Sequence, residues 1–400
     1  MNQQQAEKFY HKKMFDQKTN RLNTSCVKWD LRQQLFGGTD VLPMWIADMD
    51  FMAPPSVIDA LVQRARHGVF GYSFVPDSYY AAIINWLQRR HGWQVEKEWL
   101  AQSPGIVPAL CMLIRCFSAP GDKIIIQQPV YYPFSEIIAL NDRVLVNNAL
   151  KFDGQRYIMD FVELEQQLAA GAKIFIFCSP HNPVGRVWNK DELERVGQLC
   201  QKYNTLLISD EIHADLVYPD HKHIPIASLA KSFLNNIITC MSPSKTFNLA
   251  GLQAAYLIIP NAEMRKRYEK EQHSLCLNYP NNFGIVALEA AYNTAESWLD
   301  ELLVYLAANL KYLTEFIVQY IPQIKVIHPE GTYLVWLDCR ALGMNGTELK
   351  NFFYQEAKVA LDIGDKFGAG GVGFARINIA CPRELLVDGL QRIKDTIHAR

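Results

Sequence analysis

The chain has 400 residues, with 40 Lys and Arg against 41 Asp and Glu, so its formal net charge is −1. That balance provides neither a basic field for a nucleic-acid backbone nor a polybasic patch for a membrane, and we expect no partner of either kind. Apolar residues make up 49% of a chain longer than one hydrophobic core usually spans, so we expect a large domain and a smaller one that act on a small molecule.

Residues 1–55 form a predicted N-terminal segment, and its first 20 residues, rich in Gln, Lys and Asn, lack the apolar stretch that is typical of a secretory leader. This segment is too short to fold alone, and we expect it to pack on the C-terminal part of the chain. No apolar run approaches the ~20 residues that cross a bilayer. The cysteines lie scattered, mostly inside apolar runs, and none forms a Cys-x-x-Cys pair, which favours reduced thiols in a cytoplasmic protein.

Residues 56–295 form the predicted large domain, in which short β-branched runs alternate with helical patterns. The helical pattern over Lys190–Tyr203 has Asn189 before it and Glu192 in its first turn, the arrangement of a capping box. Nearly continuous apolar strands that alternate with helices predict a mostly parallel sheet with both faces covered, and therefore an α/β fold. The expected strands are, in chain order, Lys123–Ile126, Lys173–Cys178, Thr205–Ser209, Ile237–Met241 and Ala254–Ile259.

Residues 296–400 form a predicted smaller α+β domain. A long helix over Ser297–Tyr320 precedes a strand at Tyr333–Leu337 and a second helix near Thr347–Lys358. The glycine-rich stretch Gly364–Gly373 is interpreted as a loop rather than a phosphate cradle, because no strand-to-helix transition frames it.

Polar residues follow three of the predicted strands in the large domain. Asn182 comes shortly after the second strand, Asp210 directly after the third, and Lys245 shortly after the fourth. Ligands of open parallel sheets bind at the carboxyl ends of the strands, so an amide, a carboxylate and an amine are expected at one edge. Each residue also has a plainer interpretation, as a turn residue, a helix cap and a solvated loop lysine, respectively. Their common position at strand ends favours a shared site.

These three groups match the needs of an aldehyde cofactor with a pyridine ring. Lys245 can hold the aldehyde as a Schiff base, because burial lowers the pKa of a lysine toward that of a neutral amine. Asp210 can keep the ring nitrogen protonated, and the Asn182 amide can donate to a ring oxygen. A cofactor phosphate needs a helix N-terminus, which the apolar helical run after Ser103 and Gly105 can supply.

Several motifs occur in a fixed order along the chain: Ile46–Phe51, His67–Tyr72, Ser179–Gly185, Asp210–His213, Ser242–Lys245, Glu330–Asp338 and Arg376–Arg383. Together they resemble the fold-type I pyridoxal-phosphate enzymes, the aspartate aminotransferase superfamily, and within it the MalY/PatB group of cystathionine β-lyases. The resemblance covers nearly the whole chain. It implies a mostly parallel seven-stranded sheet in the large domain, pyridoxal 5′-phosphate as cofactor, and a homodimer with its active site at the subunit interface.

The resemblance assigns contacts with the cofactor ring. Lys245 would be the Schiff-base lysine and would shuttle protons, Asp210 would pair with the pyridine nitrogen, and Asn182 with the ring oxygen. Tyr131 would stack on the ring and take part in catalysis. His213 lies where many members of the superfamily have a tyrosine, a difference that fits the lyase group.

The resemblance also assigns contacts with the cofactor phosphate. The turn Pro-Gly-Ile-Val-Pro carries no hydroxyl, so binding would rely on the backbone amides of Ile106 and Val107 and on Ser242. Tyr72 would reach the phosphate from the other subunit of the dimer and would also act in catalysis.

The implied activity is that of a carbon–sulfur β-lyase. Arg376 would clamp the substrate α-carboxylate, a bidentate task suited to guanidinium, with Asn182 and the Ala47 backbone beside it. Lys245 would remove the α-proton, and a β-thiolate would leave, which is feasible because thiols have a pKa of about 8.5. The expected substrate is L-cystathionine, giving homocysteine, pyruvate and ammonia, with cystine and S-alkyl cysteines as further substrates.

Two other functions remain open at this point. An aminotransferase on the same scaffold would reprotonate the cofactor instead of expelling a β-group, and Lys245 and Asp210 serve both outcomes. A regulatory binding protein would use the pocket as a sensor, although the intact Lys245 and Arg376 argue against purely vestigial chemistry. The two kinds of function would be combined in this chain if it were a lyase of the MalY type with an added regulatory protein partner.

Overall fold

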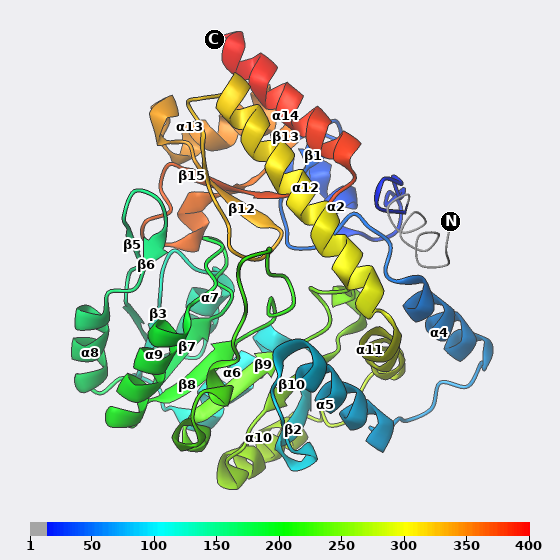
Figure 1. Cartoon of the computed structure of the whole chain (residues 1–400), viewed down its shortest axis with the longest axis vertical. Coiled ribbons are helices and arrows are strands. Elements are labelled where there is room, and N and C mark those ends of the chain that lie inside the picture. The colour runs from blue at the N-terminus through cyan, green and yellow to red at the C-terminus, as the bar shows by residue number, and fades with distance from the viewer. Residues whose placement is uncertain (1–13) are drawn as a thin grey trace.

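The computed structural model describes residues 14–400, and a seven-stranded sheet lies at the centre of the large α/β layer structure (Figure 1). The strand order is β2-β10-β9-β8-β7-β3-β4. Within this sheet only β10 runs antiparallel to its neighbours, so the prediction of a mostly parallel seven-stranded sheet is confirmed. The strands are β2 (Leu100–Ser103), β3 (Lys123–Ile126), β4 (Val144–Asn147), β7 (Ile174–Cys178), β8 (Leu206–Asp210), β9 (Ile237–Met241) and β10 (Ala255–Ile258).

Both faces of this sheet are covered, as the continuous apolar strands predict. Successive strand residues point to opposite faces, and they enter two different hydrophobic clusters: Ile124 and Ile126 belong to one, Ile125 to the other. Helices α6 (Ile106–Phe117), α7 (Pro133–Leu140) and α10 (Ala262–Ser274) cover the first face. The second face is covered by α5 (Asp77–His91), α8 (Phe161–Ala169), α9 (Lys190–Lys202) and α11 (Asn282–Thr294).

Helix α9 begins with the predicted capping box. The Asn189 side chain accepts the Glu192 N–H at 3.0 Å, and the Glu192 carboxylate accepts the Asn189 N–H at 2.9 Å. The two hydrogen bonds satisfy backbone donors that a helix leaves unpaired at its first turn. The cap therefore fixes where α9 begins, and α9 leads the chain back to β8.

The C-terminal part contains an antiparallel four-stranded sheet in the order β11-β12-β15-β14. Its strands are β11 (Lys325–Ile327), β12 (Leu334–Asp338), β14 (Asp362–Ile363) and β15 (Phe374–Asn378). The long helix α12 (Glu296–Tyr320) lies beside the last helix, α14 (Arg383–His398), as Figure 1 shows in yellow and red.

The helix expected near Thr347–Lys358 is shorter than predicted. Helix α13 (Gly346–Asn351) changes at Phe352–Glu356 into a wider π-helical turn. Three successive aromatic residues, Phe352–Tyr354, are all buried there. One face of an α-helix does not accommodate three neighbouring side chains, and the wider turn brings them all inside.

The segment before residue 55 lies against the C-terminal part. Strand β1 (Leu42–Pro43) pairs in parallel with β13 (Val359–Ala360), and the Asp50 N–H donates to the Ala380 carbonyl at 2.8 Å. The remaining elements are α2 (Val27–Asp30), α3 (Arg32–Phe36), α4 (Pro55–Arg66), β5 (Lys151–Phe152) and β6 (Tyr157–Ile158). The prediction that the chain begins without a leader rests largely on residues 1–13, which lie outside the described residues.

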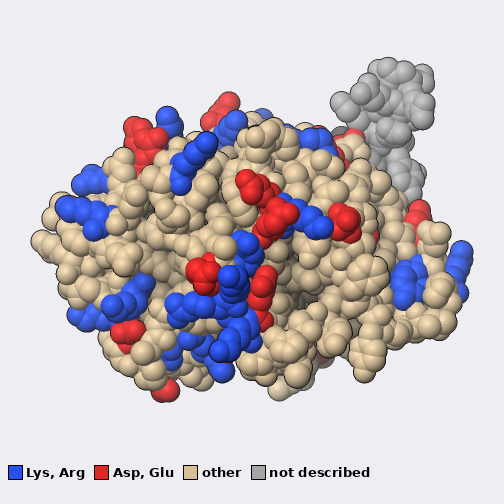
Figure 2. Space-filling model, turned by 90° about the horizontal axis from the view of Figure 1, so that it is seen from below, with Lys and Arg blue, Asp and Glu red and all other residues tan. Residues whose placement is uncertain are grey.

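Charged side chains of both signs share the surface. Figure 2 shows that the basic side chains gathered near the middle of the face seen from below have acidic ones beside them. This mixture agrees with the formal net charge of −1. Between residues 14 and 400, no helix combines the length and apolar character required to span a bilayer.

Candidate active site at the carboxyl ends of three parallel strands

The strands β7, β8 and β9 are neighbours, and their register places Cys178, Asp210 and Cys240 side by side. The residues at and after these positions therefore meet at one edge of the sheet, where a cavity of about 210 Å³ opens. Its lining contains all the predicted site residues except Tyr72 and Arg376: Ala47, Ile106, Val107, Tyr131, Asn182, Asp210, His213, Ser242 and Lys245.

Lys245 projects from the turn after β9 into this cavity. Its Nζ donates to the Ala47 carbonyl at 2.7 Å. Burial, assisted by the positive charge of Arg376, lowers the pKa of Lys245 to about 8, although Asp48 and Asp210 act in the opposite direction. At neutral pH a useful fraction of such a lysine is an unprotonated amine, the form that attacks an aldehyde.

Asp210 is the last residue of β8 and only 4% exposed. Burial raises the pKa of its carboxyl to about 7, although the Ile212 N–H, which donates at 3.2 Å, and Lys245 favour the ionised form. A ligand that brings a cationic N–H next to this carboxyl would shift the balance to the carboxylate. A pyridine nitrogen that must stay protonated is such a group.

Asn182 connects the cavity to Arg376. The Arg376 guanidinium lies outside the cavity lining, in β15, and its Nη1 donates to the Asn182 Oδ1 at 2.7 Å. Because the amide oxygen is already engaged, the amide nitrogen of Asn182 stays available to donate to a ligand oxygen. The second guanidinium nitrogen, Nη2, pairs with Asp362, directly opposite on strand β14.

Tyr131 and His213 complete the inner part of the cavity. The Tyr131 N–H donates to the Asn182 carbonyl at 3.0 Å, and burial raises the pKa of its hydroxyl to about 12. Burial, together with Lys245 and Arg376, lowers the pKa of His213 to about 3, so the imidazole is neutral at physiological pH. Its Nδ1 is buried without a hydrogen-bond partner. Buried polar atoms normally have one, so this nitrogen indicates where a ligand can bind.

The other end of the cavity is formed by the first turn of α6. The amides of Ile106 and Val107 lie in this turn, where an α-helix leaves N–H groups unpaired and attracts anions. Ser242 is less available than predicted, because its hydroxyl donates to the Ala254 carbonyl at 2.6 Å. Ser244, the second hydroxyl of the Ser242–Lys245 motif, also lines the cavity, and its N–H donates to the Ser242 hydroxyl oxygen at 3.0 Å.

Tyr72 does not join the cavity of its own chain. Its side chain is 95% exposed and lies against Tyr279, with ring centroids 5.5 Å apart. Three more large apolar side chains nearby in the sequence, Val69, Phe70 and Phe74, are also exposed. Monomeric proteins rarely leave so many neighbouring apolar side chains in water, and the segment has the character of an interaction surface.

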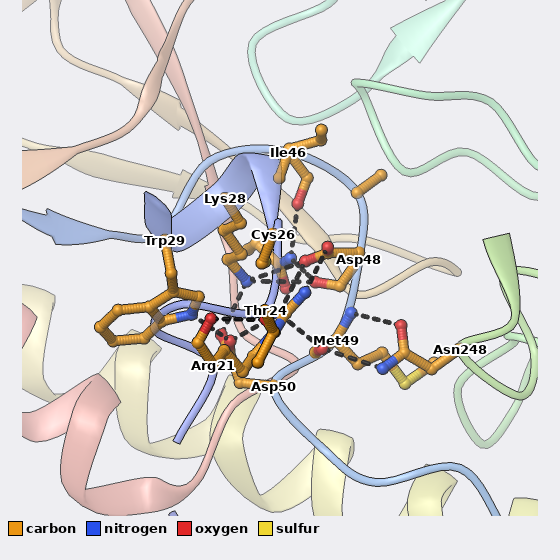
Figure 3. Close-up of polar contacts among 12 residues, drawn as sticks. Arg21, Thr24, Cys26, Lys28, Trp29, Ile46, Asp48, Met49, Asp50 and Asn248 are labelled. Atoms are coloured by element: carbon orange, nitrogen blue, oxygen red, sulfur yellow. Dashed lines mark hydrogen bonds and ion pairs between the residues drawn. The ribbon is translucent and has the colours of Figure 1, made fainter. Parts of the chain in front are cut away.

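The segment that carries Ala47 is held by a buried ion cluster that sequence reasoning missed. Figure 3 shows Arg21 and Lys28 directed toward Asp48 and Asp50. Lys28, only 1% exposed, lies 2.7 Å from Asp50, and Arg21 contacts both Asp48, at 2.7 Å, and Asp50, at 2.8 Å. No local pattern distinguishes these charges from solvated ones, because their partners lie more than 18 residues further along the chain.

A second group holds the same segment from the side of Lys245. The Asn248 side chain accepts the Met49 N–H at 3.0 Å and donates to the carbonyls of Met49 and Phe51, both at 2.9 Å (Figure 3). The Tyr333 hydroxyl donates to the Ala47 carbonyl at 3.1 Å. The carbonyl that receives the Lys245 amine is thus fixed from several sides.

Comparisons with known proteins agree with this geometry. The family described as aminotransferase class I and II matches residues 39–393. The chain is 43% identical over 381 residues to cystathionine beta-lyase PatB of Bacillus subtilis, covering 95% of this chain and 98% of PatB. It is 36% identical over 388 residues to protein MalY of Escherichia coli, covering 96% and 99%. Among solved structures, cystalysin of Treponema denticola, which contains a pyridoxal 5′-phosphate cofactor, has a TM-score of 0.93 at 36% identity, covering 96% of this chain and 98% of that one.

The chain therefore belongs to the aminotransferase class I and II family. The cavity fits the cofactor of that structural relative on its own features. A lysine of lowered pKa and a buried carboxyl line the same cavity, His213 adds an unpaired imidazole nitrogen to the lining, and a helix N-terminus closes the other end. These are the groups that an aldehyde, a pyridine nitrogen, a ring hydroxyl and a phosphate require.

Proposed function

We propose that this protein is a pyridoxal-phosphate-dependent carbon–sulfur β-lyase that cleaves L-cystathionine to homocysteine, pyruvate and ammonia. The single observation that carries the proposal is the cavity in which the amine of Lys245, the carboxyl of Asp210 and the amide of Asn182 converge, with Arg376 bound to that amide from outside the lining. Full-length similarity to PatB, a cystathionine β-lyase, supports the choice of reaction. Cystine and S-alkyl cysteines are further substrates in this proposal.

Pyridoxal phosphate supplies an aldehyde that binds amines and a ring that accepts the electron pair of the substrate Cα–H bond. Asp210 would hold the proton on the ring nitrogen, because a cation beside this buried carboxyl of raised pKa would keep it ionised. The Asn182 amide nitrogen would donate to the ring oxygen, since its own oxygen is engaged by Arg376. Tyr131 would cover the ring face.

Lys245 has two tasks in this mechanism. It would hold the cofactor aldehyde through its amine, and with that amine free its Nζ would take the α-proton of the substrate as general base. The pKa of about 8 suits that task, because the best proton carriers have pKa values near the working pH. The Ala47 carbonyl, at 2.7 Å, keeps the amine directed into the cavity while it is free.

Substrate orientation decides which bond at Cα breaks. Arg376 binds the α-carboxylate, a role suited to the two parallel N–H groups of guanidinium, with Asn182 and the Ala47 backbone beside it. The β-sulfur then leaves as a thiolate, for which a pKa of about 8.5 makes protonation unnecessary at the moment of cleavage. The Ile106 and Val107 amides and the Ser242 turn, with Ser244, hold the phosphate.

The proposal includes an assembly in which two copies share their sites. The exposed Tyr72, together with Val69, Phe70 and Phe74, forms an apolar surface that a second copy would cover, and Tyr72 would then contact the phosphate of the partner chain. We also propose that the chain divides into an N-terminal segment (1–55), a large domain (56–295) and a small C-terminal domain (296–400). The unpaired cysteines of the described residues favour a cytoplasmic location. The proposal also includes binding of a regulatory protein partner.

The proposed reaction is tested by product analysis with the purified holoenzyme. L-cystathionine, L-cystine and S-methyl-L-cysteine are each supplied without any keto acid, and pyruvate and free thiol are measured over time. We expect both products to appear together and fastest with cystathionine. The Lys245→Ala variant, which lacks the base, is the matched control and should release neither.

Conversion that requires an added keto acid would contradict the lyase and favour an aminotransferase, because transamination needs an acceptor for the amino group. Absence of the visible absorption band of bound cofactor in the wild type would contradict the cofactor assignment itself.

A further inference from the structure

Arg376 is one member of a buried cluster of three charges. Asp362 lies directly opposite Arg376 on strand β14, and one of its oxygens, Oδ2, pairs with the guanidinium. The other oxygen, Oδ1, pairs with the ammonium of Lys366, four residues further along the chain. Asp362 and Arg376 are both 2% exposed, so water screens their charges only weakly.

The charges of this cluster determine how strongly it attracts an anion. Arg376 and Asp362 alone form a neutral ion pair, which has little net attraction for a substrate carboxylate. Lys366 adds a second positive charge to the same aspartate, so that the cluster carries a net charge of +1. Burial disfavours the ionised carboxyl of Asp362, but Arg376 and Lys366 together still lower its pKa, so its carboxylate stays ionised. Burial, assisted by Arg376, lowers the pKa of Lys366, while Asp362 and Glu136 act in the opposite direction.

Lys366 is held in a defined place rather than free in solvent. Its ammonium lies 4.7 Å from the ring centroid of Tyr132, 5.6 Å from that of Phe367 and 5.9 Å from that of Trp45. Cations are attracted to the faces of aromatic rings at these distances. The side chain is 34% exposed, which leaves its charge partly desolvated and effective toward its neighbours.

We propose that Lys366 is a positioning residue for substrate binding: it balances Asp362 and thereby leaves the charge of Arg376 for the α-carboxylate. The inference rests on the proposed role of Arg376 in binding that carboxylate. It assigns to Lys366 no contact with the reacting atoms. A unit charge within about 10 Å of a carboxylate, at an effective dielectric constant near 20, changes the affinity by roughly tenfold.

The charge balance predicts a pattern across four proteins. Lys366→Met makes the cluster neutral and should weaken binding of a carboxylate ligand roughly tenfold. Asp362→Asn raises the net charge to +2 and should not weaken it. The double variant Asp362→Asn/Lys366→Met has a net charge of +1 again, and its affinity should return to within about threefold of the wild type.

The ligand for this measurement is glycine, which has an α-carboxylate and no β-group to expel, titrated into the holoenzyme and followed by the visible absorbance of the cofactor. Ethylamine, which lacks the carboxylate, is the matched ligand and should bind all four proteins equally. Lys350→Met is the matched protein control, because Lys350 also lies over an aromatic ring, at 5.9 Å from Tyr354, but is exposed on α13. It should bind glycine as the wild type does.

A double variant that binds glycine no better than Lys366→Met would overturn the proposal, since a merely structural role for these residues makes the two losses add. Equal weakening of glycine and ethylamine would overturn it as well. Lys366→Arg keeps the charge and should bind glycine like the wild type, which provides a test even if Asp362→Asn does not fold. Because glycine is not cleaved, failure of the lyase assignment and failure of this inference are separate results.

Discussion

Replacing Lys245 by Met should change how the stability of the cofactor-free protein depends on pH. Burial lowers the pKa of Lys245 from an ordinary 10.5 to about 8, which corresponds to a free-energy penalty of about 3 kcal/mol for folding with the amine protonated. Below pH 8 both the folded and the unfolded chain hold the proton, and the penalty is present in full. Between pH 8 and 10.5 the folded chain releases the proton first, so the penalty declines as pH rises.

The assay is urea unfolding of the cofactor-free wild type and of Lys245→Met at several pH values from 6.5 to 10. Relative to the wild type, the Met variant should gain about 3 kcal/mol of unfolding free energy at pH 7 but only about 1 kcal/mol near pH 10. Loss of the hydrogen bond to Ala47 and better apolar packing add a constant that does not vary with pH. The pH dependence of the difference is therefore the test, with Lys350→Met as the control that should show none.

A difference between the two proteins that stays constant from pH 7 to pH 10 would refute this reasoning. It would mean that Lys245 has an ordinary pKa in the folded protein and that almost none of its amine is neutral at pH 7. The proposed role as general base would then need another source for its neutral form.

Two further substitutions test the surroundings of Lys245. Lys28→Met leaves the buried charge of Asp50 only partly compensated, by Arg21. We expect it to lower the free energy of unfolding by about 3 kcal/mol in a urea titration. A loss below about 1 kcal/mol would show that Arg21 alone compensates the charge of Asp50. Asp210→Asn removes the anion beside the ring nitrogen and should lower kcat for pyruvate release on the order of a hundredfold, measured with saturating substrate. Full activity of that variant would exclude Asp210 from the mechanism.

Much of the large sheet is predictable because its information is local. All five expected strands match the observed bounds to within one residue at either end, since each is an apolar run between clear breakers, as Ile237–Met241 is. Strand β2 has no such run: Leu100–Ser103 includes a glutamine and a serine, and its place in the sheet depends on pairing with β10. Tertiary pairing, rather than propensity, decides segments of this kind.

The site residues also differ in how far local sequence information predicts them. Lys245, Asp210 and Asn182 are predictable because parallel strands bring their carboxyl ends to one edge, a rule that needs only the order of the strands. The pairing of Ala47 with Lys245 joins residues 198 positions apart and follows from packing of the two parts of the chain. Tyr72 lies outside the cavity of its own chain, and its proposed role depends on a second copy, whose position a single sequence does not give.

The most direct test of the proposed function is the number of turnovers completed without an amino-group acceptor. Holoenzyme at a known concentration is mixed with a large excess of L-cystathionine, and pyruvate and homocysteine are counted per active site. A β-lyase should release the two products in equal amounts over many turnovers, because each elimination restores the cofactor to Lys245. Conversion that stops after about one turnover per site, and resumes only when a keto acid is added, would contradict the account.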